Sequence, residues 1–318
     1  MRVSSNSFST DLRLQMSKLA ERQARLQQQI STGQRITTAS DDPKAMRRVL
    51  DLRNERSQLT QYQDNIATLR ENANVVYSTV NAMKRLSDRA SEIATMADGT
   101  KAPVALSAYA KEVDQLLEET LRLSNTQYRD VYIFSGTKSK DATYTASRDS
   151  DEKITAVSFD GNSNSAKIDI ALSTSVDGNY SAEGAKGILK NSANDADFIT
   201  NLIALRDNLT TAADTSLDKT ANLAALTTIK DTVLGDLDKD EVNFIDHFSS
   251  IGATLSRLET SEAITKSQVA SIEPLVSNEV DADLADSLVR LNEIQNAYSA
   301  ALQSGGMLMK TSLLDYIR

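Results

Sequence analysis

The N-terminal segment repeats an apolar side chain at alternating steps of four and three residues. Such a heptad spacing places these side chains on one stripe of an α-helix, as in the seam of a coiled coil. We therefore expect a helix over most of residues 1–30, with a stripe that packs against another helix. The series comprises Leu12, Met16, Leu19, Leu26 and Ile30, with the polar Gln23 at the remaining position.

A polar break follows this helix and leads into a second helical region. Ser31-Thr32-Gly33 predicts a loop. Asp42 followed by Pro43 predicts the start of the next helix, because Asp caps helices and Pro suits the first helical position. Apolar side chains at steps of three and four then predict a long helix to about Asp98 and another to about Leu123.

The middle of the chain has a different texture. Residues 137–190 are rich in Ser, Thr, Asp, Asn and Gly. Within them, Ile154–Phe159 and Lys167–Leu172 are predicted to be strands, because both are rich in apolar and β-branched residues and are bounded by turn residues. We expect these two strands to form one hairpin across Asp160-Gly161-Asn162.

Helical patterns return beyond the strands. A long helix is expected from about Asp240 to Ile272, and Pro274 is expected to end or kink it. The C-terminal segment then mirrors the N-terminal one, with Gln295 inside its series. The pair Gly305-Gly306 weakens this last helix by about 1 kcal/mol per glycine. The apolar residues of the series are Leu284, Leu288, Leu291, Tyr298 and Leu302.

These patterns predict a mainly α fold of long antiparallel helices, with terminal coiled-coil segments and a smaller α+β outer domain inserted in the middle. The two apolar series either fill the interior of one subunit or meet other subunits, and periodicity alone does not separate these cases. The expected parts are an N-terminal coiled-coil segment (1–40), a helical core (41–136), the outer domain (137–240), a returning core helix (241–275) and a C-terminal coiled-coil segment (276–318).

The composition favours helices packed side by side over a thick globular core. The 318 residues include no Trp and only 3 Pro. The net charge of −9 argues against nucleic acid as a partner, because phosphate binding needs a basic face. Residues 1–60 carry 11 Lys and Arg against 6 Asp and Glu, whereas residues 273–318 carry 3 against 7. The two ends could therefore attract each other, or could simply be solvated faces of different charge.

Neither a membrane segment nor a disulfide framework is indicated. The sequence has no Cys, no apolar segment of a secretory signal in its first ten residues and no run of 18 apolar residues. We expect no membrane insertion and no cleaved signal peptide.

Candidate catalytic and metal sites are weak. The one histidine, His247, neighbours Asp246 and Ser249, but side chains one and two positions apart on a helix point in different directions, which favours a structural histidine over a triad. The acidic stretch from Asp236 to Glu241 resembles the opening of a calcium loop, yet Glu241 stands where that loop needs Gly. We therefore expect the chain to have no enzymatic activity and to bind neither a cofactor nor a metal.

Stretches near both ends resemble the flagellin family, which includes flagellins and hook-associated junction proteins. The most specific stretch, QISTGQRI at residues 29–36 followed by SDDP at residues 40–43, is similar to the family pattern qIStGkRI…sDDP. The opening MRVS, VYIFSGT at 131–137 and SLLDYI at 312–317 are similar to further family motifs. Pro43 and Lys44 favour the junction proteins, because flagellins typically read DDAAG here.

The resemblance implies a structural subunit of the bacterial flagellum that is exported through the flagellar type III apparatus. The implied role is to join the hook-associated ring to the flagellin filament by coiled-coil packing of the termini. The implied partners are neighbouring copies of the chain, the first hook-associated protein, flagellin and an export chaperone at the C-terminal helix. The alternatives are a flagellin or flagellin-like filament or surface protein and, from another class, a cytosolic coiled-coil adaptor.

The same resemblance assigns roles to particular residues. The ten apolar residues of the two terminal series are expected to form the assembly interface. Arg35, Asp42 and Pro43 are expected to shape the turn between the first two helices.

Overall fold

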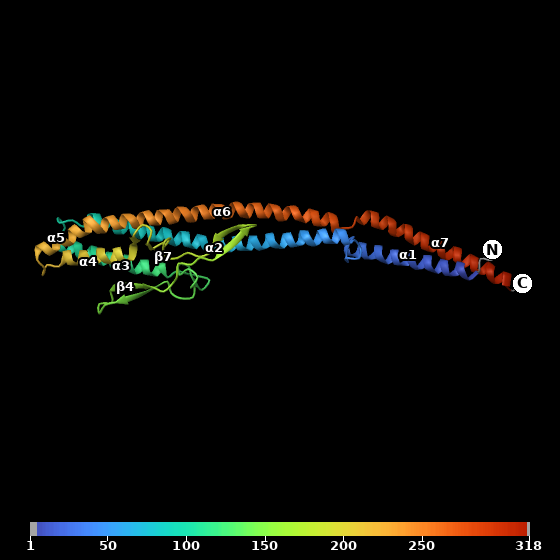
Figure 1. Cartoon of the computed structure of the whole chain (residues 1–318), viewed down its shortest axis with the longest axis horizontal. Helices are drawn as coiled ribbons and strands as arrows, with labels where there is room; N and C mark the ends of the chain where they lie inside the picture. The colour runs from blue at the N-terminus through green and yellow to red at the C-terminus, as the bar shows by residue number, and fades with distance from the viewer. Residues whose placement is uncertain (1–4, 317–318) are drawn as a thin grey trace. The chain divides into compact units, whose positions relative to one another are not determined.

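The computed structural model describes the backbone of residues 5–316 and the side chains of residues 10–307. The chain divides into two compact units: a terminal unit of residues 1–59 and 267–318, and a central unit of residues 60–266. Long helices dominate the chain, and the short strands lie in its middle (Figure 1). The predicted mainly α fold with an inserted α+β part is therefore confirmed.

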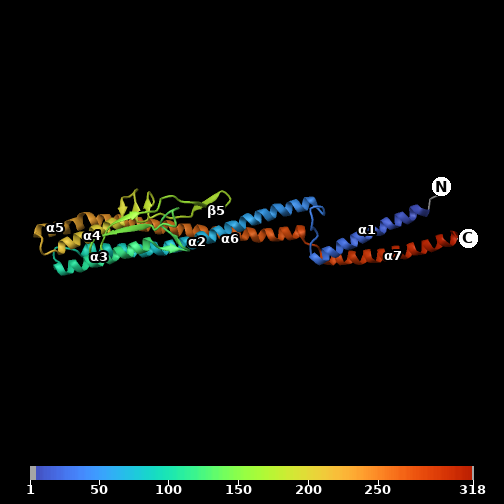
Figure 2. The ribbon, with the colours of Figure 1, turned by 90° about the horizontal axis from the view of Figure 1, so that it is seen from below.

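A pair of helices makes up most of the terminal unit. α1 (Ser5–Thr32) and α7 (Leu284–Tyr316) pack against each other in antiparallel directions (Figures 1 and 2). The unit also contains the first residues of α2 (Pro43–Met96) and the last residues of α6 (Leu234–Val280). Gly33 follows α1 with φ of +69°, a backbone conformation that glycine adopts without steric cost.

The start of α2 matches the prediction. Asp42 Oδ1 accepts hydrogen bonds from the backbone N–H groups of Lys44 and Ala45 at 3.1 and 3.0 Å, and Pro43 is the first helical residue. The aspartate thus satisfies two donors that have no partner within the helix.

The end of α6 differs from the prediction. We predicted that Pro274 ends or kinks this helix; the helix continues through Pro274 to Val280, so the first alternative is wrong and the kink stays a prediction. An internal proline removes one backbone hydrogen bond and costs about 3 kcal/mol. The turn beyond it is held from outside the helix, because Glu279 and Val280 bond to residues of the segment before α2 and to α2 itself.

The core of the central unit lies between helices. α2 and α6 pack with α3 (Pro103–Ser124), α4 (Phe198–Ala213) and α5 (Lys219–Thr228), and a π-helical segment, η1 (Ile229–Val233), leads into α6. Phe198 and Phe244 meet edge to face with ring centres 5.2 Å apart. Other fully buried members of this core are Val76, Val80, Met83, Val113, Leu117, Leu202 and Leu205.

The strands form small separate sheets between α3 and α4 in the sequence. Antiparallel pairs join β1 (Gln127–Tyr128) to β2 (Val131–Tyr132), β3 (Tyr144–Arg148) to β4 (Ile154–Phe159) and β5 (Lys167–Ala171) to β6 (Thr174–Asp177). β7 (Glu183–Gly184), β8 (Lys190–Asn191) and β9 (Ala196–Asp197) form a three-stranded sheet in which β7 and β8 are parallel.

The two predicted strands exist, but their predicted pairing is wrong. β4 pairs with β3 and β5 pairs with β6, so Asp160-Gly161-Asn162 is not the turn of a hairpin. Instead, the backbone N–H of Asn162 donates to the Ser135 carbonyl at 3.1 Å, and its side-chain oxygen accepts from the N–H of Thr137 at 2.9 Å. Each strand has a tighter turn on its other side, and a short loop costs less closure entropy.

The β5–β6 hairpin lies against α2 and α6 (Figure 2). Ile170 and Val176 pack with Ile66, Leu69 and Leu258 of these helices. Polar contacts accompany the apolar ones: Asn65 Nδ2 donates to the Asp169 carbonyl at 2.8 Å, and Ser261 Oγ donates to the Ile170 carbonyl at 3.3 Å.

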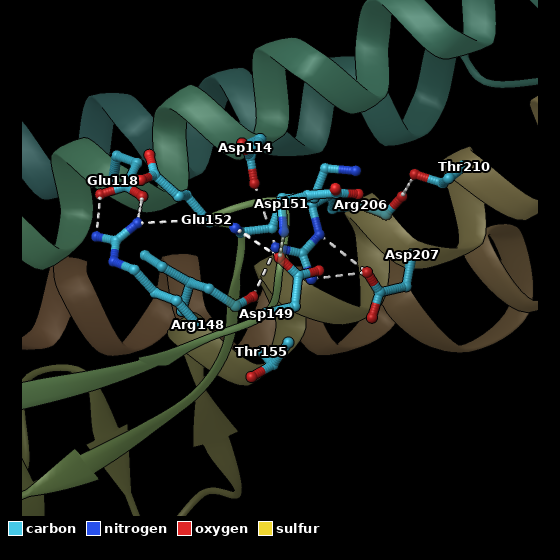
Figure 3. A network of polar contacts seen from close by, with 12 residues as sticks. Asp114, Glu118, Arg148, Asp149, Asp151, Glu152, Thr155, Arg206, Asp207 and Thr210 are labelled. Carbon is cyan, nitrogen blue, oxygen red and sulfur yellow. Dashed lines mark hydrogen bonds and ion pairs between the residues drawn. The ribbon is translucent and has the colours of Figure 1, made fainter.

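A buried arginine attaches the β3–β4 hairpin to α3 and α4 (Figure 3). The Arg206 side chain is only 7% exposed. It donates to the Ile154 carbonyl at 2.6 Å and forms ion pairs with Asp114 of α3 at 3.2 Å and with Asp207 at 2.8 Å. Arg148 at the end of β3 forms a second link, because its two terminal nitrogens bond to the carboxylate of Glu118 on α3.

Candidate assembly interface

Two backbone segments meet at the base of the α1–α7 pair. We call residues 33–42 together with residues 279–283 the elbow. The N–H of Arg35 donates to the Val280 carbonyl at 2.7 Å, and the N–H of Ala282 donates to the Gly33 carbonyl at 2.9 Å. Gln34 and Asp281 form an antiparallel bridge between them. The elbow therefore ties the early and late parts of the chain together through main-chain bonds.

Four charged side chains reinforce the elbow. The guanidinium of Arg35 donates to the Glu279 carbonyl at 2.8 Å and lies 3.5 Å from the Asp42 carboxylate. Arg48, on the first turns of α2, binds both carboxylate oxygens of Glu279 at 2.8 Å. These bonds from Arg48 hold the pKa of the Glu279 carboxyl below its ordinary value. A bidentate pair of this kind constrains orientation as well as distance.

The two adjacent aspartates of the elbow have separate roles. Asp42 caps α2, while Asp41 Oδ2 accepts from the backbone N–H groups of Thr38 at 2.9 Å and Thr37 at 3.1 Å. These bonds, led by that of Thr38, lower the pKa of Asp41 to about 2. The structure thus places two of the predicted turn residues, Arg35 and Asp42, in the elbow, and the third, Pro43, directly after it at the start of α2. Arg48 and Glu279 were not predicted, because 231 residues separate them in the sequence.

The side chains of the predicted apolar stripe of α1 are only partly buried. Side chains with intermediate burial recur at steps of four and three along α1, and apart from Gln29 the residues beside them in the helix are exposed. Within residues 10–32, no α1 side chain is fully buried. The half-buried residues of this stripe are Leu12, Met16, Leu19, Gln23, Leu26 and Ile30.

On α7 the structure uses a different register from the predicted one. The less exposed positions are Ser287, Leu291, Ile294, Tyr298, Ala301 and Gly305. Leu291 and Tyr298 belong to the prediction, but Ile294 replaces Gln295, which is exposed. A Cβ on Gly305 would lie only 2.5 Å from Leu12 Cδ2, so the Leu12 side chain of α1 packs directly against the backbone of α7 at this glycine. A pattern search that counts only large apolar residues misses such positions.

The remaining predicted leucines of α7 lie outside this contact. We call Leu284, Leu288 and Leu302 the outer stripe. They are 47%, 48% and 49% exposed. Leu14 of α1 and Val289 and Met307 of α7 are exposed to a similar or greater degree. Exposed apolar side chains gathered on one helix pair are typical of a surface that binds another protein.

The contacts of His247, the candidate catalytic histidine, indicate a structural role. His247 Nε2 lies 3.1 Å from the Gly187 carbonyl, which makes Nε2–H the donor, and burial lowers the pKa of the ring. No group of three His, Cys, Asp or Glu side chains within the described part of the chain is placed to hold a metal. No helix of residues 5–316 has a stretch long and apolar enough to cross a membrane.

Asp240, from the predicted acidic stretch, is buried. One carboxylate oxygen accepts from Asn201 Nδ2 at 2.7 Å, while Oδ1 has no partner among the described residues. Burial raises the pKa of Asp240 to about 7, and the charges of Asp197 and Asp236 raise it further against the bond from Asn201. The native state therefore keeps a proton between about pH 4 and pH 7 that the unfolded chain releases.

Comparisons with known proteins agree with the sequence motifs. Residues 3–139 match the family model of the bacterial flagellin N-terminal helical region. Flagellar hook-associated protein 3 of Escherichia coli K12 is 25% identical over 295 residues, which cover 88% of this chain and 89% of that protein.

Solved structures show the same fold. A Vibrio parahaemolyticus protein assigned as a flagellar hook-associated protein aligns with a TM-score of 0.62 and 21% identity, over 76% of this chain and 100% of that chain. Hook-associated protein 3 of Legionella pneumophila aligns with a TM-score of 0.60 and 14% identity, over 71% and 97%. The N-terminal region of this chain is therefore of the bacterial flagellin type, and the chain as a whole is similar in sequence and in fold to hook-associated proteins of the flagellum.

Proposed function

We propose that this chain joins the hook-associated ring to the flagellin filament, and that α1 and α7 do so by packing against neighbouring copies of the chain. The outer stripe is the observation that carries this proposal. Leu284, Leu288 and Leu302 keep about half of their surface uncovered, although leucine gains free energy from burial.

Within residues 10–32 and 284–307, the terminal helix pair has no fully buried large apolar side chain. The α1 side chains of residues 10–32 are at most half-buried, and the inner positions of α7 include the small residues Ser287, Ala301 and Gly305. Helices draw most of their stability from tertiary packing. Neighbouring subunits would supply the packing that a single α1–α7 pair does not provide.

The elbow supports the same role. Its main-chain bonds and the Arg48–Glu279 pair hold the base of α1 and α7, so the outer stripe is presented from an ordered support. We further propose that the chain works in the extracellular flagellum, where the first hook-associated protein and flagellin lie on either side of it. An export chaperone that covers α7 before assembly would protect the same apolar surface.

A filament or surface protein of the flagellin type is the second candidate. The match of residues 3–139 to the flagellin N-terminal region favours it. The two candidates differ in copy number, since flagellin forms the bulk of a filament and a junction needs only a ring.

Deletion of the gene tests the proposal. Electron microscopy of the mutant cells should show hooks without filaments, and flagellin should accumulate as monomer in the medium. A plasmid copy of the wild-type gene should restore filaments. Intact filaments in the mutant would refute the junction role and favour the second candidate, and loss of the hooks would place the protein earlier in assembly.

A further inference from the structure

A polar cavity of about 390 Å³ lies in the central unit, between α6 and the segments around the β5–β6 hairpin. Its size is within the range of small-molecule sites, which typically enclose about 300–1,000 Å³. The terminal helices contribute nothing to it, so the assembly role proposed above leaves it unexplained. We call it the polar pocket.

One face of α6 lines the polar pocket with polar side chains only. His247, Ser250, Thr254 and Arg257 follow each other at steps of three, four and three residues, which puts them on one face of the helix. The adjacent face, with Phe244, Ile251 and Leu258, is apolar and buried in the core. α6 therefore presents a second, polar face to an open pocket, in which His247 and Thr254 are partly buried and Ser250 and Arg257 are exposed.

Positive charge gathers in the polar pocket. Lys167, Lys186 and Arg257 line it, and none of them forms an ion pair with another residue in the part of the chain that the structure describes. Asp177 is the acidic residue of the lining. The local charge is thus positive in a chain with a net charge of −9, which favours an anionic ligand.

Hydroxyl groups complete the lining. Ser163, Ser165, Ser175 and Ser250 line the polar pocket, and their hydroxyls have no hydrogen-bond partner among the described residues. Tyr180 adds an aromatic ring that is partly buried. A hydroxyl can both donate and accept, so this set suits a ligand that carries several hydroxyl groups of its own.

We propose that the polar pocket binds a sugar bearing a carboxylate or sulfate group. Lys186 and Arg257 bind the anionic group, because charge-assisted hydrogen bonds to an oxyanion are stronger than neutral ones. The serine hydroxyls bond to the sugar hydroxyls, and the ring of Tyr180 covers an apolar face of the sugar. The cavity is larger than a single inorganic oxyanion needs, and the scarcity of apolar lining residues disfavours an apolar ligand.

A calorimetric titration of the full chain tests this assignment. The probes are 3′-sialyllactose, neutral lactose and sodium sulfate, at equal ionic strength. The variant Lys186→Gln/Arg257→Gln removes the two cations. The control Arg85→Gln/Lys140→Gln removes the same charge from exposed side chains of the central unit outside the polar pocket.

We expect the sialylated sugar to bind at least ten-fold more tightly than lactose or sulfate. The double variant should weaken that binding at least ten-fold, and the control should leave it unchanged. Equal binding of sulfate and the sialylated sugar would overturn the sugar assignment, and equal binding of lactose would overturn the role of the cations. Absence of binding by all three probes would overturn the proposal as a whole.

Discussion

The outer stripe gives the sharpest test of how the terminal helices work. Replacing Leu284, Leu288 and Leu302 together by Gln removes the exposed apolar surface and keeps α7 helical, because Gln and Leu have similar helix propensities. Each leucine is already about half covered within the subunit. Loss of that covered half should cost the isolated subunit at most about 1 kcal/mol per leucine, and the control variant described below, in residues of similar exposure, carries a comparable cost.

Assembly should respond much more strongly. Full burial of a leucine contributes about 1.5–3 kcal/mol, so covering the remaining half of each side chain contributes about 1 kcal/mol. Three leucines together then contribute about 3 kcal/mol to each contact, which corresponds to roughly 100-fold in affinity. We expect the triple variant to be lost from the flagellum even though it is made and folded normally.

The assay compares the amount of chain recovered with sheared flagella from strains that carry each variant in place of the wild-type gene. Circular dichroism of the purified variants checks that the helices are retained. The control replaces Leu223, Val242 and Ile245 by Gln, because these residues of the central unit are 52%, 55% and 43% exposed. The reasoning is refuted if the outer-stripe variant is incorporated as well as the wild type, or if the control is lost equally.

Three further predictions concern the folding of the subunit. Gly306→Ala should stabilise the chain by about 1 kcal/mol through helix propensity, whereas Gly305→Ala should stabilise it less, because the new Cβ must displace the Leu12 side chain 2.5 Å away. Thermal unfolding followed by circular dichroism measures the difference, and equal gains in stability would contradict the close approach of Leu12 to Gly305. The wild-type chain should lose up to about 4 kcal/mol of stability as the pH rises from 4 to 8, because Asp240 has a pKa of about 7 in the folded state. Asp240→Asn should remove most of this pH dependence, as measured by urea unfolding at the two pH values. An unchanged pH dependence in the variant would contradict the role of Asp240. Arg206→Met should lower the free energy of unfolding by about 2–3 kcal/mol, because it leaves the buried Ile154 carbonyl without this donor. Urea unfolding measures the change. A loss below about 0.5 kcal/mol, the ordinary scale of surface substitutions, would show that the bond is dispensable.

Local signals in the sequence predicted the local structure well. Asp42 and Pro43 start a helix in almost any context, and the heptad spacing around Leu19 requires a helix with one less exposed stripe. β4 and β5 were predicted for the same reason, whereas the other strands of the middle segment were not. The partners of β4 and β5 were not predicted, because the choice between competing hairpins depends on contacts such as that of Asn162 with Thr137, which the strand patterns do not contain.

Contacts between distant parts of the chain could not be predicted in the same way. Nothing in the sequence around Arg206 indicates that it binds the Ile154 carbonyl, 52 residues away. The register of α7 was missed because both possible series have the required spacing, and the close approach at Gly305 decides between them. Helix existence follows from periodicity, whereas the face that a helix uses depends on the shape of its partner.

Protection of a single thiol would test the central claim most directly. The sequence has no Cys, so Leu288→Cys carries a unique reactive group on the outer stripe. A maleimide reagent should label it readily in the purified subunit, where Leu288 is 48% exposed, and at least ten-fold more slowly in sheared flagella. Lys140→Cys, on an exposed part of the central unit, should react at the same rate in both. Equal labelling of the cysteine at position 288 in the free and assembled protein would contradict the account, because the outer stripe would then remain uncovered in the flagellum.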